Sequence, residues 1–363
     1  MKHFHSFVVA AIIISLATSN ANAQLNMPRG SQQASVGQTV GITKMQIDYS
    51  RPSVNGRKIW GALVPYGMNN LGFGTAKESP WRAGADENTT FYTSTDVTVE
   101  GKQLKAGTYG LHMIIDENDK ATIIFSNNST AWGSFFYKPE EDALRVDVST
   151  KSIPHVEQLT YEFLDVTPNS ATVALNWEKK QIPFKVGVDV NKTVLTDIKD
   201  KLQNQPGFNR QTWEQAATFV LNNGGDYKEA EGWIDNAIGG QFYSQKTFNN
   251  LAIKAQLQKK QGNNQGYETT MAEAMGMATE NQLNTLGYQM MNAKDYENAL
   301  KYFKQAIVLN PKSANAYDSL GEYYATVGDK ENAIKNFKKS LSMNPPANVK
   351  ANSEKYLKQL GAM

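Results

Sequence analysis

The chain has 363 residues and a formal net charge of +2, with 37 basic and 35 acidic side chains interspersed along it. This length allows two domains with a core each. The balanced charge excludes a basic surface for nucleic acid, and the absence of cysteine excludes disulfides, thiolate metal sites and cysteine nucleophiles.

Residues 1–23 have the pattern of a secretory signal peptide. Lys2 gives a basic start, residues 7–17 are apolar, and Ala21-Asn22-Ala23 forms a small-residue cleavage site. The apolar run is about half of the ~20 residues that a membrane-spanning helix needs. We therefore expect a mature chain that begins at Gln24, does not span a membrane after cleavage, and is exported to the periplasm, cell envelope or exterior.

Residues 24–190 indicate an all-β domain. Residues 24–38 contain Pro28, Gly30 and Gly37, which predict an extended lead-in. Apolar and polar residues then alternate with a period of two, as at Met45, Ile47 and Tyr49. Turn residues separate about eight such runs between residues 39 and 190, which predicts an antiparallel β-sandwich or barrel-like domain.

After residue 190 the periodicity becomes helical. Residues 191–209 form a predicted connector, in which a polar helix ends at Pro206-Gly207. From residue 210 to residue 363, segments with helical spacing come in pairs. A single pair cannot bury its own apolar face, so a stacked array is expected.

One pattern of 34 residues is repeated in this part of the chain. Gly287, Ala299 and Phe303 recur as Gly321, Ala333 and Phe337, and Pro311 recurs as Pro345. This spacing is the signature of the tetratricopeptide repeat. It predicts an α-solenoid with clean repeats at 280–313 and 314–347 and a capping helix at 348–361.

The first helix of each repeat lines a groove in such arrays, which predicts a protein or peptide partner. The side chains expected on this face are Asn284, Tyr288, Met291, Asn292, Asp318 and Glu322. Asn side chains suit a peptide backbone because each amide both donates and accepts hydrogen bonds. The face lacks the lysines that clamp the carboxylate of heat-shock chaperones, which argues against that partner.

Residues 49–90 are not explained by periodicity. Glycine and proline are frequent, and Arg51, Arg57 and Arg82 occur among Trp60 and Trp81. Guanidinium groups and aromatic rings in a loop can form a polar recognition site. The alternative is that these arginines stack on aromatic rings and pair with carboxylates to hold a loop in place.

Several motifs here resemble a known family. YSRP, GRKIWG, LVPYG, WRAGADENT, DVTVEGKQLKAGTYGL and AWGS occur in this order, and residues 28–190 are similar to the bacterial secreted family named domain of unknown function 2911. The resemblance implies an exported β-sandwich-like domain without an established activity. Many relatives lack most of residues 68–80. The candidate ligand site comprises Arg51, Arg57, Trp60, Trp81, Arg82, Glu87 and Trp132.

Three functions stay open at this stage. The first is a non-enzymatic binding or scaffold protein, whose β domain takes a small polar or glycan ligand. The second is an envelope hydrolase acting on a glycan or peptide, with Asp86, Glu87 and His112 as acid or base groups. The third is a β domain that only stabilises the repeats. We expect no cofactor and no metal, since two isolated histidines remain after signal cleavage.

Overall fold

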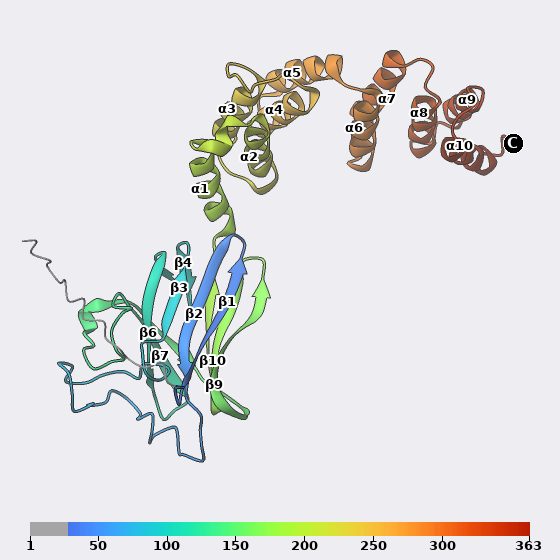
Figure 1. Ribbon diagram of the computed structural model, residues 1–363. Coiled ribbons are helices and arrows are strands. Elements are labelled where there is room, and N and C mark those ends of the chain that lie inside the picture. Colours follow the sequence, from blue (N-terminus) through green and yellow to red (C-terminus); the bar gives the residue numbers. More distant parts are fainter. Residues whose placement is uncertain (1–27) are drawn as a thin grey trace, which may run out of the picture. The chain divides into compact units, whose positions relative to one another are not determined.

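The computed structural model describes residues 28–363, so the predicted signal peptide lies outside the described part. The chain divides between Thr193 and Val194 into two compact units. The first is an antiparallel β domain and the second is built of α-helices (Figure 1). This confirms the predicted fold class, an all-β domain followed by an α-solenoid.

The β domain contains two antiparallel sheets. The larger has the strand order β1-β2-β3-β6-β7-β8 and consists of β1 (Gln32–Val40), β2 (Thr43–Arg51), β3 (Thr90–Thr93), β6 (Gly107–Ile115), β7 (Lys120–Ser126) and β8 (Asp142–Ser149). The smaller has the order β5-β4-β10-β9 and consists of β4 (Val97–Val99), β5 (Lys102–Leu104), β9 (Lys151–Thr167) and β10 (Ser170–Gly187).

The two sheets share one hydrophobic core, to which alternate residues of their strands contribute. Met45 and Ile47 of β2 are buried in it, as are Leu111 of β6 and Val173 of β10. The period-two alternation therefore predicted which faces are buried. This is the sandwich arrangement expected for an antiparallel domain.

The extended lead-in predicted for residues 24–38 was wrong for its second half. Strand β1 begins at Gln32 and pairs with β2 along its whole length, from Gln32 opposite Arg51 to Val40 opposite Thr43. β1 is an edge strand in which Ala34 and Val36 are only half-buried. A weak apolar face of this kind gives little periodic signal.

A long loop, residues 52–89, connects β2 to β3 at one end of the sandwich (Figure 1). Contacts with distant strands hold it in place. Val54 N donates to Glu157 O (2.8 Å), and Trp81 and Met113 exchange two backbone hydrogen bonds of 2.9 and 2.8 Å. The loop is ordered by tertiary contacts and not by local periodicity.

The second unit contains ten α-helices among the described residues, of which α1 crosses the boundary between the units. Their bounds are α1 (Val190–Leu202), α2 (Arg210–Asn223), α3 (Tyr227–Ile238), α4 (Phe248–Lys260), α5 (Asn264–Met277), α6 (Glu280–Asn292), α7 (Tyr296–Leu309), α8 (Ala314–Thr326), α9 (Lys330–Leu341) and α10 (Ala347–Gln359). From α2 to α9 they pack as four consecutive hairpins, and α10 packs on α8 and α9.

Small residues set the spacing of the helix pairs. A Cβ atom on Gly287 would lie 2.6 Å from the Phe303 ring, and one on Gly321 would lie 2.8 Å from the Phe337 ring. Both rings are fully buried. The glycine of each repeat is therefore required because the ring of the second helix occupies the space of its missing side chain.

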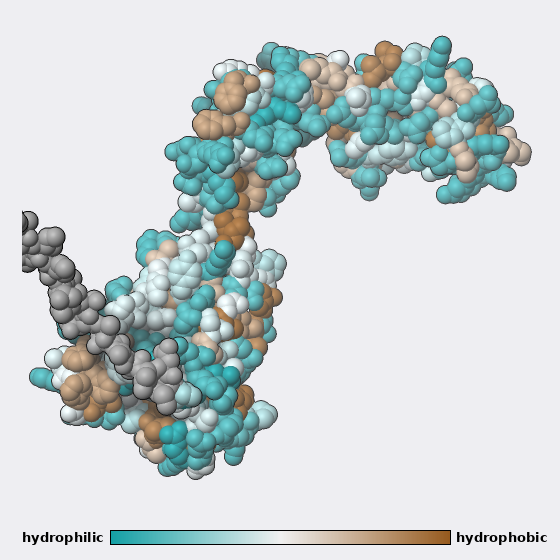
Figure 2. Space-filling model, in the orientation of Figure 1, coloured by the Kyte–Doolittle hydropathy of each residue, from teal (hydrophilic) through white to brown (hydrophobic). Residues whose placement is uncertain are grey.

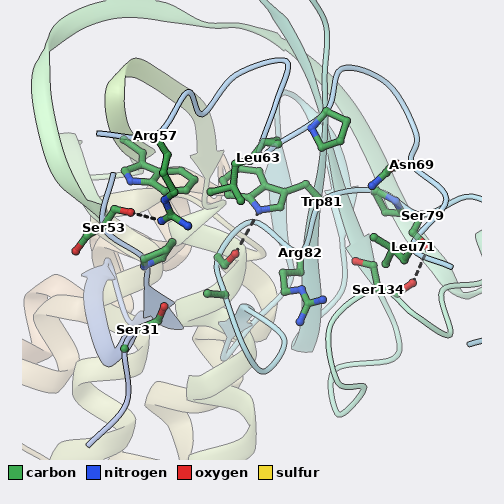
Figure 3. A pocket seen from close by; sticks show the side chains of 18 of the residues that line it. Ser31, Ser53, Arg57, Leu63, Asn69, Leu71, Ser79, Trp81, Arg82 and Ser134 are labelled. Atoms are coloured by element: carbon green, nitrogen blue, oxygen red, sulfur yellow. Dashed lines mark hydrogen bonds between the residues drawn. The ribbon is translucent and has the colours of Figure 1, made fainter. Parts of the chain in front are cut away.

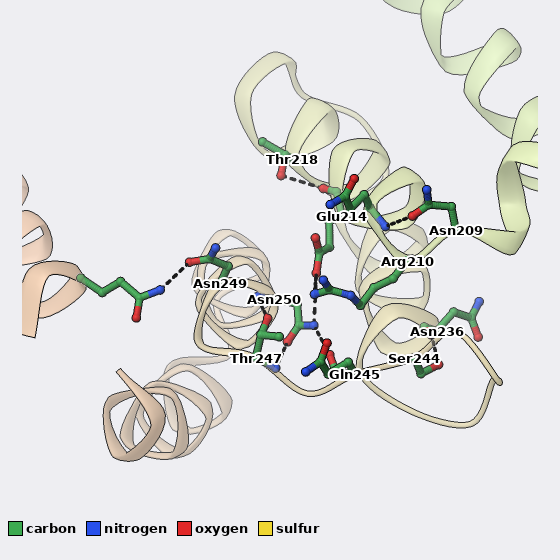
Figure 4. A network of polar contacts seen from close by, with 12 residues as sticks. Asn209, Arg210, Glu214, Thr218, Asn236, Ser244, Gln245, Thr247, Asn249 and Asn250 are labelled. Atoms are coloured by element: carbon green, nitrogen blue, oxygen red, sulfur yellow. Dashed lines mark hydrogen bonds and ion pairs between the residues drawn. The ribbon is translucent and has the colours of Figure 1, made fainter. Parts of the chain in front are cut away.

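A polar network joins the first two hairpins (Figure 4). Asn250 at the start of α4 is fully buried, and its Nδ2 donates to Gln245 O (2.7 Å) and to Glu214 of α2 (3.3 Å). Glu214 also pairs with Arg210 at 2.7 Å. This network connects α2, α4 and the segment before α4 through one side chain.

Candidate functional site

A pocket of about 570 Å³ lies in the β domain, and the long loop supplies most of its walls (Figure 3). Trp81 and Arg82 line it from the end of the loop, and Trp177 lines it from β10. The other polar side chains of the lining are those of Ser31, Ser53, Asn55, Arg57, Asn69, Ser79 and Ser134. A concave site with an aromatic wall and a few polar groups is typical of small-molecule binding.

Two tryptophans, Trp81 and Trp177, line the pocket, and Trp60 packs against both without being part of the lining. Trp81 and Trp177 are stacked, with ring centroids 5.9 Å apart and an interplanar angle of 15°. Trp60 packs edge-on against both, at 5.9 and 6.0 Å. The indole N–H groups of Trp60 and Trp177 are buried and have no hydrogen-bond partner in the structure. Unpaired buried donors are uncommon, because each loses its hydrogen bonds to water.

Arg82 is the principal cation of the pocket. Its guanidinium donates to Asp86 O (2.6 Å) and lies over the Phe135 ring, 5.0 Å from the centroid. It forms no ion pair with a carboxylate of residues 28–363. Burial lowers the pKa of Arg82, and the charge of Asp86 opposes this effect only in part. The pocket therefore presents a cation without a bonded counter-ion.

Gly133 of the AWGS motif makes room for this guanidinium. Its φ is +65°, and a Cβ atom there would lie 2.3 Å from the Arg82 Cζ atom. Any side chain at position 133 would displace Arg82. The sequence marks a glycine at this position but gives no reason to place it beside Arg82.

The other two arginines differ in their surroundings. Arg57 lines the pocket and donates to the carbonyl oxygens of Ser53 and Val54. Arg51 does not line it, because its guanidinium donates to Leu159 O (3.0 Å) and to Thr160 Oγ1 (2.6 Å) of β9. Arg57 is consistent with recognition, whereas Arg51 joins the two sheets.

Glu87 and Trp132 lie at a second pocket, of about 660 Å³. Glu87 forms an ion pair with Arg29 and not with Arg82. The hydrogen bond from Arg29 is the main cause that lowers the pKa of Glu87. Trp132 is 54% exposed at this pocket. The structure thus divides the predicted ligand site, with Arg57, Trp81 and Arg82 at one pocket and Glu87 and Trp132 at the other.

The predicted acid and base groups do not converge. His112 is buried on β6, where its Nδ1 lies 3.0 Å from Ser134 Oγ, and it lines neither pocket. Asp86 offers its backbone carbonyl to Arg82. No observation here favours a hydrolase over a binding site.

Two lining residues were not predicted to belong to this site. Ser134 and Trp177 reach the pocket from positions far along the chain, and Ser79 Oγ donates to Ser134 O (2.8 Å) across its wall. Trp177 alternates with apolar residues in a strand, so its position indicated a core residue. The structure shows that it also contacts the loop, because its ring stacks on Trp81.

The predicted peptide-binding face of the repeats is partly covered. Asp318 is buried, and its carboxylate accepts hydrogen bonds from Asn352 (2.8 Å) and Ser353 of α10. Asn352 also donates to Glu322 (2.6 Å). Asp318 therefore anchors the last helix and does not present an open surface to a partner, which corrects its place in the expected contact face.

The remaining residues of this face lie on α6. Tyr288 Oη bonds to Ser319 Oγ of α8 (3.2 Å), and Met291 is half-buried. Asn292 is exposed, and the Asn284 side-chain oxygen is buried without a hydrogen-bond partner. The exposed Asn292 amide can both donate and accept hydrogen bonds with a bound segment.

The fold and sites define a β domain with an arginine-containing pocket, followed by a repeat scaffold. Residues 31–186 match the family model described as "Protein of unknown function (DUF2911)". Residues 281–313 and 314–346 each match a model described as "Tetratricopeptide repeat". This is the domain order that the sequence motifs indicated, and tetratricopeptide repeats make the helical unit a scaffold for protein interactions.

A search of curated proteins finds no match. Solved structures similar to the chain include MamA, with 17% identity, coverage of 43% of this chain and 89% of that one, and a TM-score of 0.28. Another is "YrrB: a TPR protein with an unusual peptide-binding site", which is 16% identical, with 46% of this chain and 84% of that one covered and a TM-score of 0.27. The pilF protein of Pseudomonas aeruginosa is 19% identical, with 41% of this chain and 68% of that one covered and a TM-score of 0.27.

Neither a membrane-spanning helix nor a metal site is found in the described part. Within residues 28–363, no helix combines the length and the apolar composition needed to cross a bilayer. The same residues contain no group of three or more His, Asp or Glu side chains placed to hold a metal ion.

Proposed function

We propose that this protein is an exported binding and scaffold protein whose β domain holds a small anionic ligand in the pocket of Arg57 and Arg82. The observation that carries the proposal is the half-buried Arg82 guanidinium, which bonds to a carbonyl oxygen but to no carboxylate of residues 28–363. Partial burial of a cation is unfavourable unless an anion compensates it. A ligand carboxylate or phosphate would supply that charge and accept paired hydrogen bonds from the guanidinium.

Binding of small anions tests this proposal directly. We would titrate the mature chain with a panel of small carboxylates and phosphates and follow heat or tryptophan fluorescence, since Trp81 and Trp177 line the pocket. Arg82→Gln should weaken binding about tenfold or more, as expected for loss of a charge-assisted hydrogen bond. Arg145→Gln on β8, which loses an ion pair with Asp142 outside this pocket, is the matched control.

Two outcomes would reject the ligand proposal. One is that the folded wild-type chain binds none of the anions. The other is that Arg82→Gln and Arg145→Gln bind them as well as the wild type does.

We further propose that the repeats hold a protein segment against the exposed part of α6. The exposed Asn292, whose amide both donates and accepts hydrogen bonds, supports this position. A photo-crosslinking residue at position 292 should capture an envelope protein, whereas the same residue at position 338, which is exposed on the second helix of a repeat, should not. Equal capture at both positions would argue against this face.

A further inference from the structure

We propose that the ligand is an acidic oligosaccharide, whose acid group binds at Arg82 and whose neighbouring sugar ring stacks on an aromatic platform formed by Phe73 and Phe136. This inference rests on the proposed function of the pocket and names its ligand class. The platform lies in the 68–80 segment and in residues 134–137, outside the site predicted from the sequence.

The platform consists of aromatic rings that are unusually open to solvent. Phe73 is 69% exposed and Phe136 is 43% exposed, and their ring centroids lie 6.2 Å apart. Phe73 also packs edge-to-face with Phe135, at 5.7 Å. Figure 2 shows apolar surface on the loop-bearing end of the β domain. Grouped exposed apolar side chains of this kind mark interaction sites.

The backbone holds the platform in a fixed shape. Thr75 N and Ala76 N both donate to Phe135 O at 3.1 Å, and Asn69 and Ser79 exchange hydrogen bonds of 2.9 and 2.8 Å. Gly74 has a φ of +85°, and a Cβ atom there would lie 2.1 Å from Phe135 O. Because the segment is fastened in this way, a ligand would find the rings already placed.

Two chain segments and one cation–π contact link the pocket lining to the platform. Leu71 and Ser134 line the pocket, and each lies two residues before a platform ring in the sequence. Arg82, whose cation lies over Phe135, connects the two surfaces. A ligand with its acid group at Arg82 could therefore extend onto Phe73.

The chemistry of the two surfaces favours a sugar. A pyranose ring has an apolar C–H face that packs on an aromatic ring, and its hydroxyl groups match the serine and asparagine side chains of the pocket. A phospholipid surface would instead be attracted by clustered basic residues. Residues 68–80 carry only Lys77 and Glu78, which balance in charge.

The test compares sugars of different length on the whole mature chain. The probes are galacturonate, mannuronate and glucuronate as monosaccharides, and tetragalacturonate, tetramannuronate and a chondroitin tetrasaccharide, with calorimetry as the readout. At least one acidic tetrasaccharide should bind about tenfold more tightly than its monosaccharide, the scale of one aromatic contact. Phe73→Ala/Phe136→Ala should abolish this gain and leave monosaccharide binding unchanged.

A matched control exists on the helical unit. Phe208 and Phe242 are 64% and 84% exposed, with centroids 6.2 Å apart. Phe208→Ala/Phe242→Ala removes the same number of exposed rings and should leave sugar binding unchanged.

The outcomes separate this inference from the proposed function. If no acidic tetrasaccharide binds more tightly than its monosaccharide, or if the platform variant keeps the gain, the inference is overturned while the Arg82 pocket stands. If Arg82→Gln leaves binding unchanged, the pocket proposal itself fails. If the platform variant instead loses co-sedimentation with phosphatidylglycerol vesicles and binds sugars normally, the platform contacts membranes and the inference is again overturned.

Discussion

His112 makes the folding stability of the β domain depend on pH. It is 2% exposed, beside Ser134 and the Tyr137 ring, and burial, followed by the charge of Arg82, lowers its pKa to about 4. An unfolded histidine has a pKa near 6.5. Between these values the unfolded chain binds more protons, so stability falls as pH falls through this window, and above about pH 6.5 the effect vanishes.

We expect this histidine to reduce the free energy of unfolding by about 3 kcal/mol between pH 6.5 and pH 4. Urea unfolding at several pH values measures the effect. His112→Gln should lose this part of the slope even if the variant is less stable at every pH, and the exposed His155→Gln should keep it. An unchanged slope in His112→Gln would show that other groups cause the acid sensitivity.

The repeat glycines give a second prediction at the level of single residues. Gly287→Ala places a methyl group where the Phe303 ring lies, so we expect destabilisation of about 1–3 kcal/mol. Gly232→Ala in α3 is the control, because nothing lies within 4 Å of its added Cβ. There the better helix propensity of alanine should stabilise by about 0.5–1 kcal/mol. Thermal unfolding that shifts both variants in the same direction would contradict this interpretation.

At the level of elements, Asn250 holds the start of α4 in place. It forms a reciprocal cap with Thr247 and also donates to Gln245 O and Glu214. Asn250→Ala removes the reciprocal half of the cap and leaves Thr247 N and Gln245 O without these partners, which should cost about 2 kcal/mol of stability. Asn249→Ala changes the neighbouring, exposed asparagine, which has one 3.3 Å bond to Gln282.

Denaturant unfolding of the helical unit distinguishes these two variants. We expect the unfolding midpoint to be lower for Asn250→Ala and almost unchanged for Asn249→Ala, with the same dependence of the free energy on denaturant concentration in both. A similar loss in both would mean that the link to α6 matters as much as the cap.

The elements also show what a sequence can and cannot predict here. The repeats were predictable because Gly287 and Phe303 contact each other within one hairpin, so their spacing is written locally. The loop of residues 52–89 was not, because Trp81 is placed by Met113 and Val54 by Glu157. Aromatic and arginine residues identified the region of the pocket. They could not separate Arg82, which faces it, from Arg51, which bonds to β9.

For the whole molecule, the two units should unfold separately because each has its own hydrophobic core. Phe337 is fully buried in the last repeat, and Phe337→Ala should destabilise the helical unit by about 3–5 kcal/mol. The helix signal in the far ultraviolet follows that unit, and the near-ultraviolet signal of the stacked Trp81–Trp177 pair follows the β domain. Only the helix transition should move.

A ligand that binds the pocket should shift the unfolding transition of the β domain and not that of the helical unit. At a concentration 100 times its dissociation constant, it should stabilise the β domain by about 2.7 kcal/mol, since it binds the folded state alone. The near-ultraviolet transition should then shift while the helix transition stays where it was. A ligand that shifts both transitions together would show that the units are coupled, in which case ligand binding in the pocket would be communicated to the protein-binding repeats.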